Sequence, residues 1–536
     1  MNAKRRAASL LLAVLLAACA NTSATPTPAG SSPAAPRPTP VTTIPSPIAA
    51  AAGAIPSERP TAIPAPTSVP TPGATERPLS TPHESPTTAT AGNCPLPAVV
   101  NQGWPVAGAA VPLFGIDGTI FAVRRDGTAE AAPRDIVALD ARGHVPPGWP
   151  ICLPAGVRSV ELAVGDDGSL YATICQREAS GCRLDRFTVD GVEPPGWPVP
   201  LEGMSRCFAP LVASDGIVYA SCDVRSDDGD LEAGLTVAVD PRSGVVPGWP
   251  VHVGGQPELA PDGTLYVGAW QSNWEDSPLT VAAFAPDGSL RPGWPLSLPV
   301  TAGVTLSRDG TTVGWWYEGL QEGEGGHYAS RTFYALIGPD GRTLPGWPRS
   351  ASGAASDPAI GPDGTLYYSS VDGDVYAFDR TGAVKRGWPV RGVGGGGLSL
   401  GRPYLSPGGS VLALDRSGVT ALSPAGKPLW SWGPGRSGSL SWCTGGATGC
   451  GGSGASNPPL FAPDGTVYLI VYVADVDDEA VRVRTEIAAL DPSGHSKPGW
   501  PQGGGRYCPS VGPDGRLYVA GEKGLYALKP DGSLVR

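Results

Sequence analysis

The sequence predicts an all-β protein, a single β-propeller of four-stranded antiparallel blades, and three observations support this fold class. Gly-Trp-Pro recurs at intervals of roughly 41 to 53 residues, which is the length of one propeller blade. Asp-Gly turns recur in the same rhythm, each between two short runs typical of β-strands. A further alternating run follows each hairpin, so every unit supplies four strands.

The repeated tryptophans mark the last of these four strands. Eight occur in Gly-Trp-Pro, and a ninth occurs in a divergent copy of the motif, Pro428-Leu429-Trp430. We expect each to lie in the fourth, outermost strand of a blade and to have a structural role. Proline fits such an edge strand because it has no N–H to donate to a further strand. Sugar stacking is the alternative for these residues. The nine are Trp104, Trp149, Trp197, Trp249, Trp294, Trp347, Trp388, Trp430 and Trp500.

The Asp-Gly turns predict the number of blades. In Pro261-Asp262-Gly263, proline and aspartate suit the centre of a type I turn, and glycine suits the left-handed residue that closes the hairpin. Nine such turns and nine tryptophan strands predict nine blades, with eight as the alternative. The domain opens at Trp104 without a preceding hairpin, and it ends at Pro530–Arg536 without a following tryptophan. We therefore expect residues near Trp104 to close the ring as the fourth strand of the last blade, which removes an exposed edge.

Two segments before the repeats differ from them in composition. Residues 1–18 predict a lipoprotein signal peptide, because three basic residues precede a short apolar run. Leu16-Ala17-Ala18-Cys19 resembles the lipobox of bacterial lipoproteins, which implies cleavage before Cys19 and a lipid on its thiol; an ordinary signal peptide is the alternative. Residues 19–93 are predicted to be the lipid anchor and a disordered stalk rich in Pro, Thr, Ala and Ser. Residues 94–536 are the predicted propeller domain.

Charge and the anchor indicate where the protein acts. The formal net charge is −11 and no basic patch follows the first six residues, so we expect no nucleic-acid partner. Lipid on Cys19 predicts attachment to the cell membrane with the propeller facing outward, in an extracytoplasmic or periplasmic space.

The repeat resembles the PQQ-like repeats of quinoprotein-type propellers, which include the BamB-like outer-membrane assembly lipoproteins. The resemblance lies in an Ala-x-Asp turn followed by tryptophan, as in Ala238-Val239-Asp240 before Trp249 and Ala377-Phe378-Asp379 before Trp388. It implies that each tryptophan docks on the neighbouring blade. Rings of that family commonly have eight blades and a Gly-x-x-x-Trp spacing, so nine blades and Gly-Trp-Pro depart from the pattern.

Cysteine spacing predicts disulfides, which persist in exported chains. Three local pairs are expected: Cys175 with Cys182, Cys207 with Cys222 across a hairpin, and Cys443 with Cys450 around a Gly-rich insertion. The pairing of the other cysteines stays open: Cys94 with Cys508 would staple the closing blade, and Cys94 with Cys152 would tie the entrance to the first blade. Histidine at ligand spacing does not accompany these pairs, so we expect no metal site.

Catalytic motifs do not appear in the chain. The adjacent cysteines that cover the cofactor in quinoproteins and the haem motif Cys-x-x-Cys-His are both lacking, so PQQ is not supported and no cofactor is expected. The sequence therefore predicts a non-catalytic, membrane-anchored binding or scaffold module for protein or glycan. The alternative is a propeller enzyme, either a quinone-dependent dehydrogenase or a polysaccharide hydrolase or lyase.

Aromatic residues outside the repeat are the predicted binding candidates, because function concentrates on loops over a rigid scaffold. One group follows the second strand of a blade and another lies in the next blade, shortly before a Gly-rich insertion. Packing within an enlarged blade is the alternative. The candidates are Trp270, Trp274, Trp315, Trp316, Tyr317 and Trp442.

Overall fold

The computed structural model describes most of the predicted propeller domain. The described residues are 90–91, 103–125, 132–176, 181–225, 231–270, 279–298, 303–307, 312–318, 321–323, 326–328, 331–352, 355–394, 402–415, 417–434, 438–440, 459–476, 481–503, 509–521 and 524–535. All of them belong to one of the chain's two compact units, which comprises residues 1–22 and 88–536; residues 23–87 form the other. The predicted signal peptide, Cys19 and all but the end of the predicted stalk lie outside these ranges.

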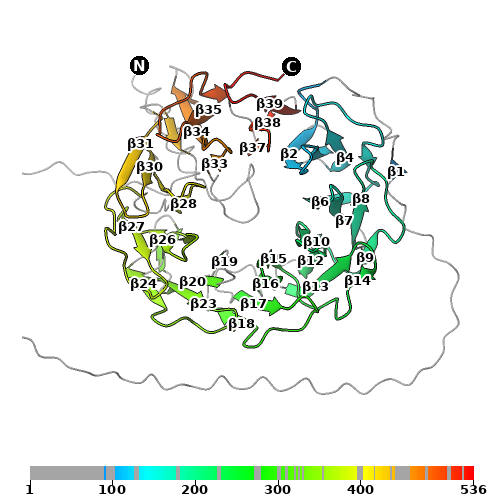
Figure 1. Ribbon diagram of the computed structural model, residues 1–536, viewed down its shortest axis with the longest axis horizontal. Helices are drawn as coiled ribbons and strands as arrows, with labels where there is room; N and C mark the ends of the chain where they lie inside the picture. Colours follow the sequence, from blue (N-terminus) through cyan, green and yellow to red (C-terminus); the bar gives the residue numbers. More distant parts are fainter. Residues whose placement is uncertain are drawn as a thin grey trace, which may run out of the picture. The chain divides into compact units, whose positions relative to one another are not determined.

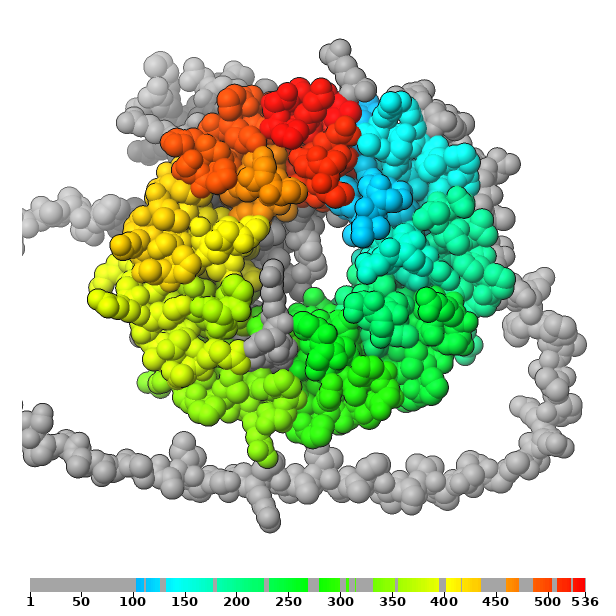
Figure 2. Space-filling view, viewed as in Figure 1, coloured from blue at the N-terminus to red at the C-terminus, as the bar shows by residue number. Residues whose placement is uncertain are grey.

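Within these ranges the secondary structure is all β, and successive sheets follow one another around a ring (Figure 1). Seven sheets have at least four strands, and two have three strands plus an isolated bridge, which gives nine blades among the residues described. This count agrees with the nine blades that the motifs predict. In Figure 2 the blades, coloured from blue to red, meet around a central hollow, with the red end of the chain against the blue.

The first three blades contain the following strands. Blade 1 consists of β2 (Ala109–Phe114), β3 (Ile120–Arg125), β4 (Pro133–Leu139) and β5 (Ile151–Cys152). Blade 2 consists of β6 (Val157–Val164), β7 (Leu170–Gln176), β8 (Cys182–Phe187) and β9 (Val199–Leu201). Blade 3 consists of β10 (Arg206–Cys207), β11 (Leu211–Val212), β12 (Val218–Arg225), β13 (Leu231–Asp240) and β14 (Gly244–Val245).

The middle blades carry the largest additions. Blade 4 consists of β15 (Gln256–Leu259), β16 (Leu265–Trp270), β17 (Leu279–Phe284) and β18 (Leu296–Leu298). Blade 5 consists of β19 (Gly303–Leu306), β20 (Thr312–Glu318), β23 (Arg331–Ile337) and β24 (Arg349–Ser352), with the separate hairpin of β21 (Gln321–Gly323) and β22 (Gly326–Tyr328) between β20 and β23. Blade 6 consists of β25 (Ala359–Ile360), β26 (Leu366–Ser369), β27 (Val375–Phe378) and the bridge from Val375 to Val390.

The last three blades complete the ring. Blade 7 consists of β28 (Tyr404–Leu405), β29 (Val411–Asp415), β30 (Gly418–Leu422) and β31 (Pro428–Trp432). Blade 8 consists of β32 (Gly438–Leu440), β33 (Leu460–Phe461), β34 (Val467–Val476), β35 (Val481–Leu490) and β36 (Gln502–Gly503). Blade 9 consists of β37 (Ser510–Val511), β38 (Leu517–Gly521) and β39 (Gly524–Leu528).

The two ends of the domain meet in blade 9. Val106 pairs antiparallel with Leu525 of β39 through two backbone hydrogen bonds of 2.8 and 2.9 Å. The predicted closure by residues next to Trp104 is therefore confirmed. A further short strand, β1 (Thr90–Ala91), pairs with the outer strand of blade 1, with Thr90 opposite Cys152.

The predicted position of the repeat tryptophans needs one correction. Gly-Trp-Pro lies in a turn before the fourth strand and not in that strand: β5 begins directly after Trp149-Pro150. The reason is local, because the Trp149 N–H bonds back to the carbonyl of Pro146 and the following proline has no N–H for a ladder. The eight Trp-Pro peptide bonds are cis. Trp430, in the divergent copy, does lie within a strand, β31.

Seven of the eight Gly-Trp-Pro tryptophans donate an indole hydrogen bond to a carbonyl of the next blade, and the eighth, Trp197, packs against the apolar cluster between blades 2 and 3. The Trp149 indole N–H donates to the carbonyl of Val189 in blade 2 at 2.9 Å, and Trp249 donates in the same way to Pro286 in blade 4 at 3.0 Å. Apolar side chains fill the space between blades, where Phe121 of blade 1 packs in one cluster with Leu170 of blade 2. The core thus lies at the blade boundaries, and the tryptophans join neighbouring blades as the family resemblance implied.

Strand direction gives the ring two unlike faces. Because neighbouring strands of a blade are antiparallel, the turns from first to second strand and from third to fourth strand lie on one face, which we name the turn face. The connections from second to third strand and the links between blades lie on the opposite face, which we name the loop face. Asp262 shows the chemistry of the turn face: its carboxylate accepts a hydrogen bond from the Thr264 backbone N–H at 3.0 Å and fixes the hairpin.

Candidate binding face

The turn face collects exposed aliphatic side chains. Ile116 is 78% exposed and lies in the first hairpin of blade 1, while Val192 is 58% exposed and follows the third strand of blade 2. The other six also lie between third and fourth strands or at the start of the fourth. Single exposed apolar residues are common on protein surfaces, so these eight indicate a contact surface only together with a larger apolar feature on the same face. Among the residues described, the exposed large aliphatics are Ile116, Val189, Val192, Val245, Leu290, Val384, Leu429 and Leu534.

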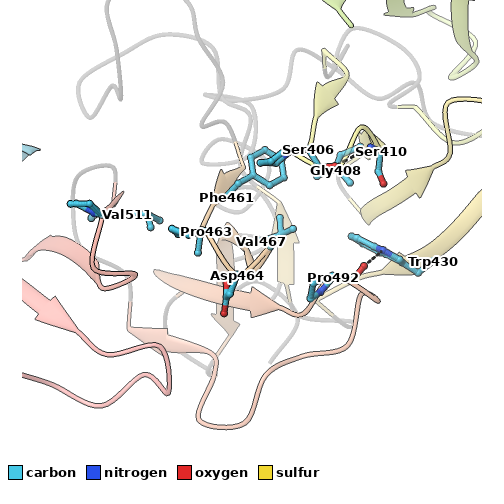
Figure 3. Close-up of a pocket in the computed structure, with 16 residues that line it drawn as sticks. Ser406, Gly408, Ser410, Trp430, Phe461, Pro463, Asp464, Val467, Pro492 and Val511 are labelled. Atoms are coloured by element: carbon cyan, nitrogen blue, oxygen red, sulfur yellow. Dashed lines mark hydrogen bonds between the residues drawn. The ribbon is translucent and has the colours of Figure 1, made fainter. Parts of the chain in front are cut away.

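The same face contains a cavity of about 620 Å³ across blades 7, 8 and 9 (Figure 3). Its walls come from the first hairpins of these three blades together with Trp430 and Pro492. Phe461 and Val467 of blade 8 line it, together with Leu412 and Trp430 of blade 7. The cavity is therefore bounded mainly by aromatic, aliphatic and proline side chains.

A single register position explains why the cavity occurs here. In seven blades the second residue of the second strand is Phe or Tyr, and its ring packs on the repeat tryptophan of the same blade; in blade 8, Tyr468 and Trp500 have centroids 5.3 Å apart. Leu412 occupies this position in blade 7 and has no ring. Blade 5 has Val313, and its tryptophan, Trp347, packs instead on Phe378 of the next blade with centroids 6.1 Å apart.

One side of the Trp430 indole contacts the backbone of blade 8, and the other side lines the cavity. Its indole N–H donates to the Pro492 carbonyl at 3.0 Å, as drawn in Figure 3. A Cβ at Gly494 would overlap the indole ring, so the backbone of blade 8 lies directly against it. Trp430 is half-buried, whereas Trp149, Trp249, Trp294, Trp347, Trp388 and Trp500 are only 5–9% exposed.

Three polar side chains, those of Ser406, Ser410 and Asp464, line the cavity. Ser406 Oγ accepts a hydrogen bond from the Ser410 N–H at 2.9 Å. Asp464 accepts from the Thr466 N–H at 2.9 Å and from Lys497 Nζ at 3.2 Å. Burial raises the pKa of Asp464, but these hydrogen bonds outweigh it and hold the pKa below its ordinary value. The cavity thus offers apolar area and few free hydrogen-bonding groups.

The predicted aromatic candidates lie on the loop face side of blades 4 and 5. Trp270 is the last residue of β16, opposite Leu279, and not a loop residue. Trp315, Trp316 and Tyr317 lie in β20. β16 and β20 are both second strands and both run toward the loop face, so their ends reach the same face of the ring. Their role in binding stays a prediction.

The remaining candidates, Trp274 and Trp442, lie outside the described residues, as do Cys443 and Cys450. The structure contains the two other predicted local disulfides, Cys175–Cys182 and Cys207–Cys222. Cys152 is also disulfide-bonded, and its partner lies outside the described ranges because the other described cysteines are paired with one another.

The described part of the chain contains one group of three closely spaced residues that could bind a metal, Cys175, Cys182 and Cys207. Their sulfurs are in disulfides rather than free as thiolates. Asp185 and Glu193 form a carboxyl pair inside blade 2, where Arg183 Nε lies 2.9 Å from the Asp185 carboxylate. Burial raises the pKa of Asp185 to about 6, and burial together with the charge of Asp185 raises that of Glu193 to about 7. Asp185 is fully buried, so this pair belongs to the blade interior.

The sheet topology defines the class of this chain as a β-propeller protein. Similar solved structures include a eukaryotic initiation factor, with a TM-score of 0.44, 11% identity, and coverage of 74% of this chain and 88% of that one. They also include BamB from Moraxella catarrhalis, with a TM-score of 0.37, 15% identity, and coverage of 78% and 98%. A third is the Dos1 propeller, with a TM-score of 0.35, 11% identity, and coverage of 59% and 76%. No protein-family model matches the chain, and no curated protein matches it significantly.

Among the described residues no helix is long and apolar enough to span a membrane.

Proposed function

We propose that this chain is a non-catalytic, lipid-anchored scaffold that binds a protein partner through its turn face. The anchor is Cys19, on the sequence pattern alone, and the Pro-rich segment after it spaces the propeller from an extracytoplasmic or periplasmic membrane surface. The observation that carries the proposal is the gathering of eight exposed aliphatic residues on one face together with the cavity at Trp430.

A protein partner fits this face better than a glycan. Sugar recognition needs several donors and acceptors around an aromatic platform, whereas only three polar side chains, those of Ser406, Ser410 and Asp464, line the cavity. An apolar cavity with an open tryptophan face suits an aliphatic or aromatic side chain inserted by a polypeptide.

The charges on the turn face indicate which kind of protein surface would complement it. Hydrogen bonds from the Ser289 and Thr381 side chains lower the pKa of Asp287 and Asp379, so these turn aspartates are ionised at neutral pH. Similar turn aspartates recur from blade to blade between the exposed aliphatics, as at Asp531. A partner with apolar side chains rimmed by Lys and Arg complements such a surface, since opposite potentials favour encounter and register.

Site-specific photo-cross-linking in the intact envelope of the host tests this function. A photoreactive residue at Val384 or Leu429, both exposed on the turn face, should cross-link to one protein of defined mass. A photoreactive residue at Glu232, which is exposed at the loop-face end of β13, is the matched control. Cross-links from Glu232 but not from the turn-face positions would assign binding to the other face, and attachment to glycan alone would overturn the protein-partner proposal.

Cys19→Ala tests the anchor separately. The variant should leave the membrane fraction and appear in the soluble fraction, because the single predicted lipid attachment is lost. Unchanged membrane association would contradict the anchor without affecting the cross-linking result.

A further inference from the structure

The boundary between blades 2 and 3 holds two disulfides side by side. Cys175 of β7 lies opposite Cys182 of β8 in blade 2, and Cys207 of β10 lies opposite Cys222 of β12 in blade 3. All four belong to the same apolar cluster between the two blades. Each existing bond therefore ties two strands within one blade, while the sulfurs of both bonds share one inter-blade space.

The sulfur of Cys207 is within reach of the other disulfide. The Sγ atoms of Cys175, Cys182 and Cys207 all lie within 4.8 Å of one another, whereas Cys222 is not a member of this group. Cys207 is 5% exposed, the most of the four, and Cys222 is fully buried. A thiolate at Cys207 would thus lie within 4.8 Å of both sulfurs of the disulfide across the boundary.

We propose that these four cysteines form a thiol–disulfide exchange site that accepts a dithiol and moves a disulfide from within a blade to between blades. The dithiol reduces Cys207–Cys222 and is itself oxidised to a disulfide, which leaves thiols on Cys207 and Cys222. The Cys207 thiolate then attacks one sulfur of Cys175–Cys182. The Cys207–Sγ bond forms as the old bond breaks, and the leaving sulfur departs as a thiolate that takes up a proton.

The disulfide formed by the exchange joins two blades, whereas each original disulfide joins two strands of one blade. A bond from Cys207 to Cys182 or Cys175 links β10 of blade 3 to blade 2 covalently. The inter-blade contact there is otherwise non-covalent: Leu184 and Val218 take part in apolar packing, and Thr173 Oγ1 donates a hydrogen bond to the Phe208 carbonyl at 3.0 Å. The exchange consumes no further electrons, because the second step only transfers a bond.

Disulfide mapping of Cys222→Ser in the full chain tests the site. This variant leaves Cys207 as a free thiol beside Cys175–Cys182. Trypsin cleaves after Arg177 and Arg206, so the three cysteines fall on different peptides. We expect a peptide pair that joins Cys207 to Cys175 or Cys182. The rate at which this pair forms should rise about tenfold per pH unit below the thiol pKa, because the thiolate is the nucleophile.

Cys207→Ser is the matched control, because it breaks the same disulfide but leaves the thiol at Cys222, outside the three-sulfur group. It should retain Cys175–Cys182, with inter-blade peptide at least about tenfold less abundant than in Cys222→Ser. Limited reduction of the native chain with dithiothreitol, followed by acid quenching, should give the same inter-blade peptide without any substitution. Intact Cys175–Cys182 with fully alkylatable Cys207 in both experiments would overturn the proposal.

Discussion

Leu412 shows how one side chain can determine whether a propeller surface contains a cavity. At its register position Tyr367, Tyr468 and Tyr518 place a ring against a repeat tryptophan, with centroid separations of 5.4, 5.3 and 5.5 Å. Leucine leaves that space unfilled, and the indole of Trp430 becomes the wall of a cavity. The cavity thus results from leucine at a position where most blades have an aromatic ring, and not from an added loop.

Leu412→Phe should fill the cavity. The new ring would pack on Trp430 as its counterparts do, and such aromatic pairs stabilise by about 1 kcal/mol. We expect a higher urea midpoint with an unchanged m-value, together with weaker partner binding. Tyr468→Leu is the converse variant: it should cost about 2 kcal/mol and open a similar cavity in blade 8. Equal partner affinity for Leu412→Phe and the native chain would show that the cavity is not used.

The pair formed by Asp185 and Glu193 predicts a pH dependence of stability. Their pKa values are raised by burial to about 6 and about 7, so the folded protein holds protons that the unfolded chain releases. Their contribution is therefore fully present below about pH 4 and is lost as the pH rises through about 7. Glu193→Gln keeps the uncharged state at all pH values. Its thermal midpoint should exceed that of the native chain near about pH 8 and match it near about pH 4.5; a constant difference at both values would contradict this assignment.

At the scale of the element, the Trp-Pro turn joins each blade to the next. The indole N–H of Trp149 bonds to a carbonyl of blade 2, and its ring packs between Phe121 and Phe187 with centroids 5.5 and 6.4 Å away. One side chain thus supplies both a hydrogen bond and apolar contact across the boundary.

Trp149→Phe separates these two contributions. Phenylalanine keeps much of the apolar contact but cannot donate to Val189, so we expect a loss of about 1 to 2 kcal/mol in the free energy of unfolding. Trp430→Phe, at one of the half-buried copies, should cost less, because water can hydrate the freed Pro492 carbonyl. Urea denaturation of both variants gives the comparison. An equal or larger loss at Trp430 would contradict the view that exposure sets the effect.

The elements were predictable from the sequence because their signals are local. The Asp262-Gly263 hairpin and the alternating strands after it define a blade without any tertiary information. The position of Trp149 relative to its strand was mistaken, since a repeated motif gives its period but not where the ladder begins. The cavity was missed because the repeats were not aligned residue by residue after each hairpin. An alignment of Val411-Leu412 with Val467-Tyr468 would have shown that leucine stands where the other blade has tyrosine.

At the scale of the whole domain, closure depends on very few residues. The bridge from Val106 to Leu525 completes blade 9, and the cluster around it includes Leu139 of blade 1 and Tyr518 of blade 9. The last and first blades are held by this bridge, by the apolar cluster around it, and by hydrogen bonds from Trp104 Nε1 and Arg516 Nη1 to the Ala141 carbonyl of blade 1.

Val106→Pro should loosen this closure. Proline removes the N–H that bonds to the Leu525 carbonyl at 2.8 Å, which should cost at least about 1 kcal/mol and increase amide exchange in β39. Val106→Ala is the control, because it keeps both backbone hydrogen bonds and loses only side-chain packing. Unchanged exchange in Val106→Pro would show that the ring is closed by other contacts.

The central claim is that the turn face, with the cavity at Trp430, binds a protein. The most direct measurement is hydrogen–deuterium exchange of the propeller with and without the cross-linked partner, once that partner is purified. Binding at the turn face predicts slower exchange in the hairpins that line the cavity, at 406–410, 462–465 and 511–513, with loop-face peptides unchanged. Slower exchange confined to the loop face, for example at the ends of β16 and β20, would contradict it.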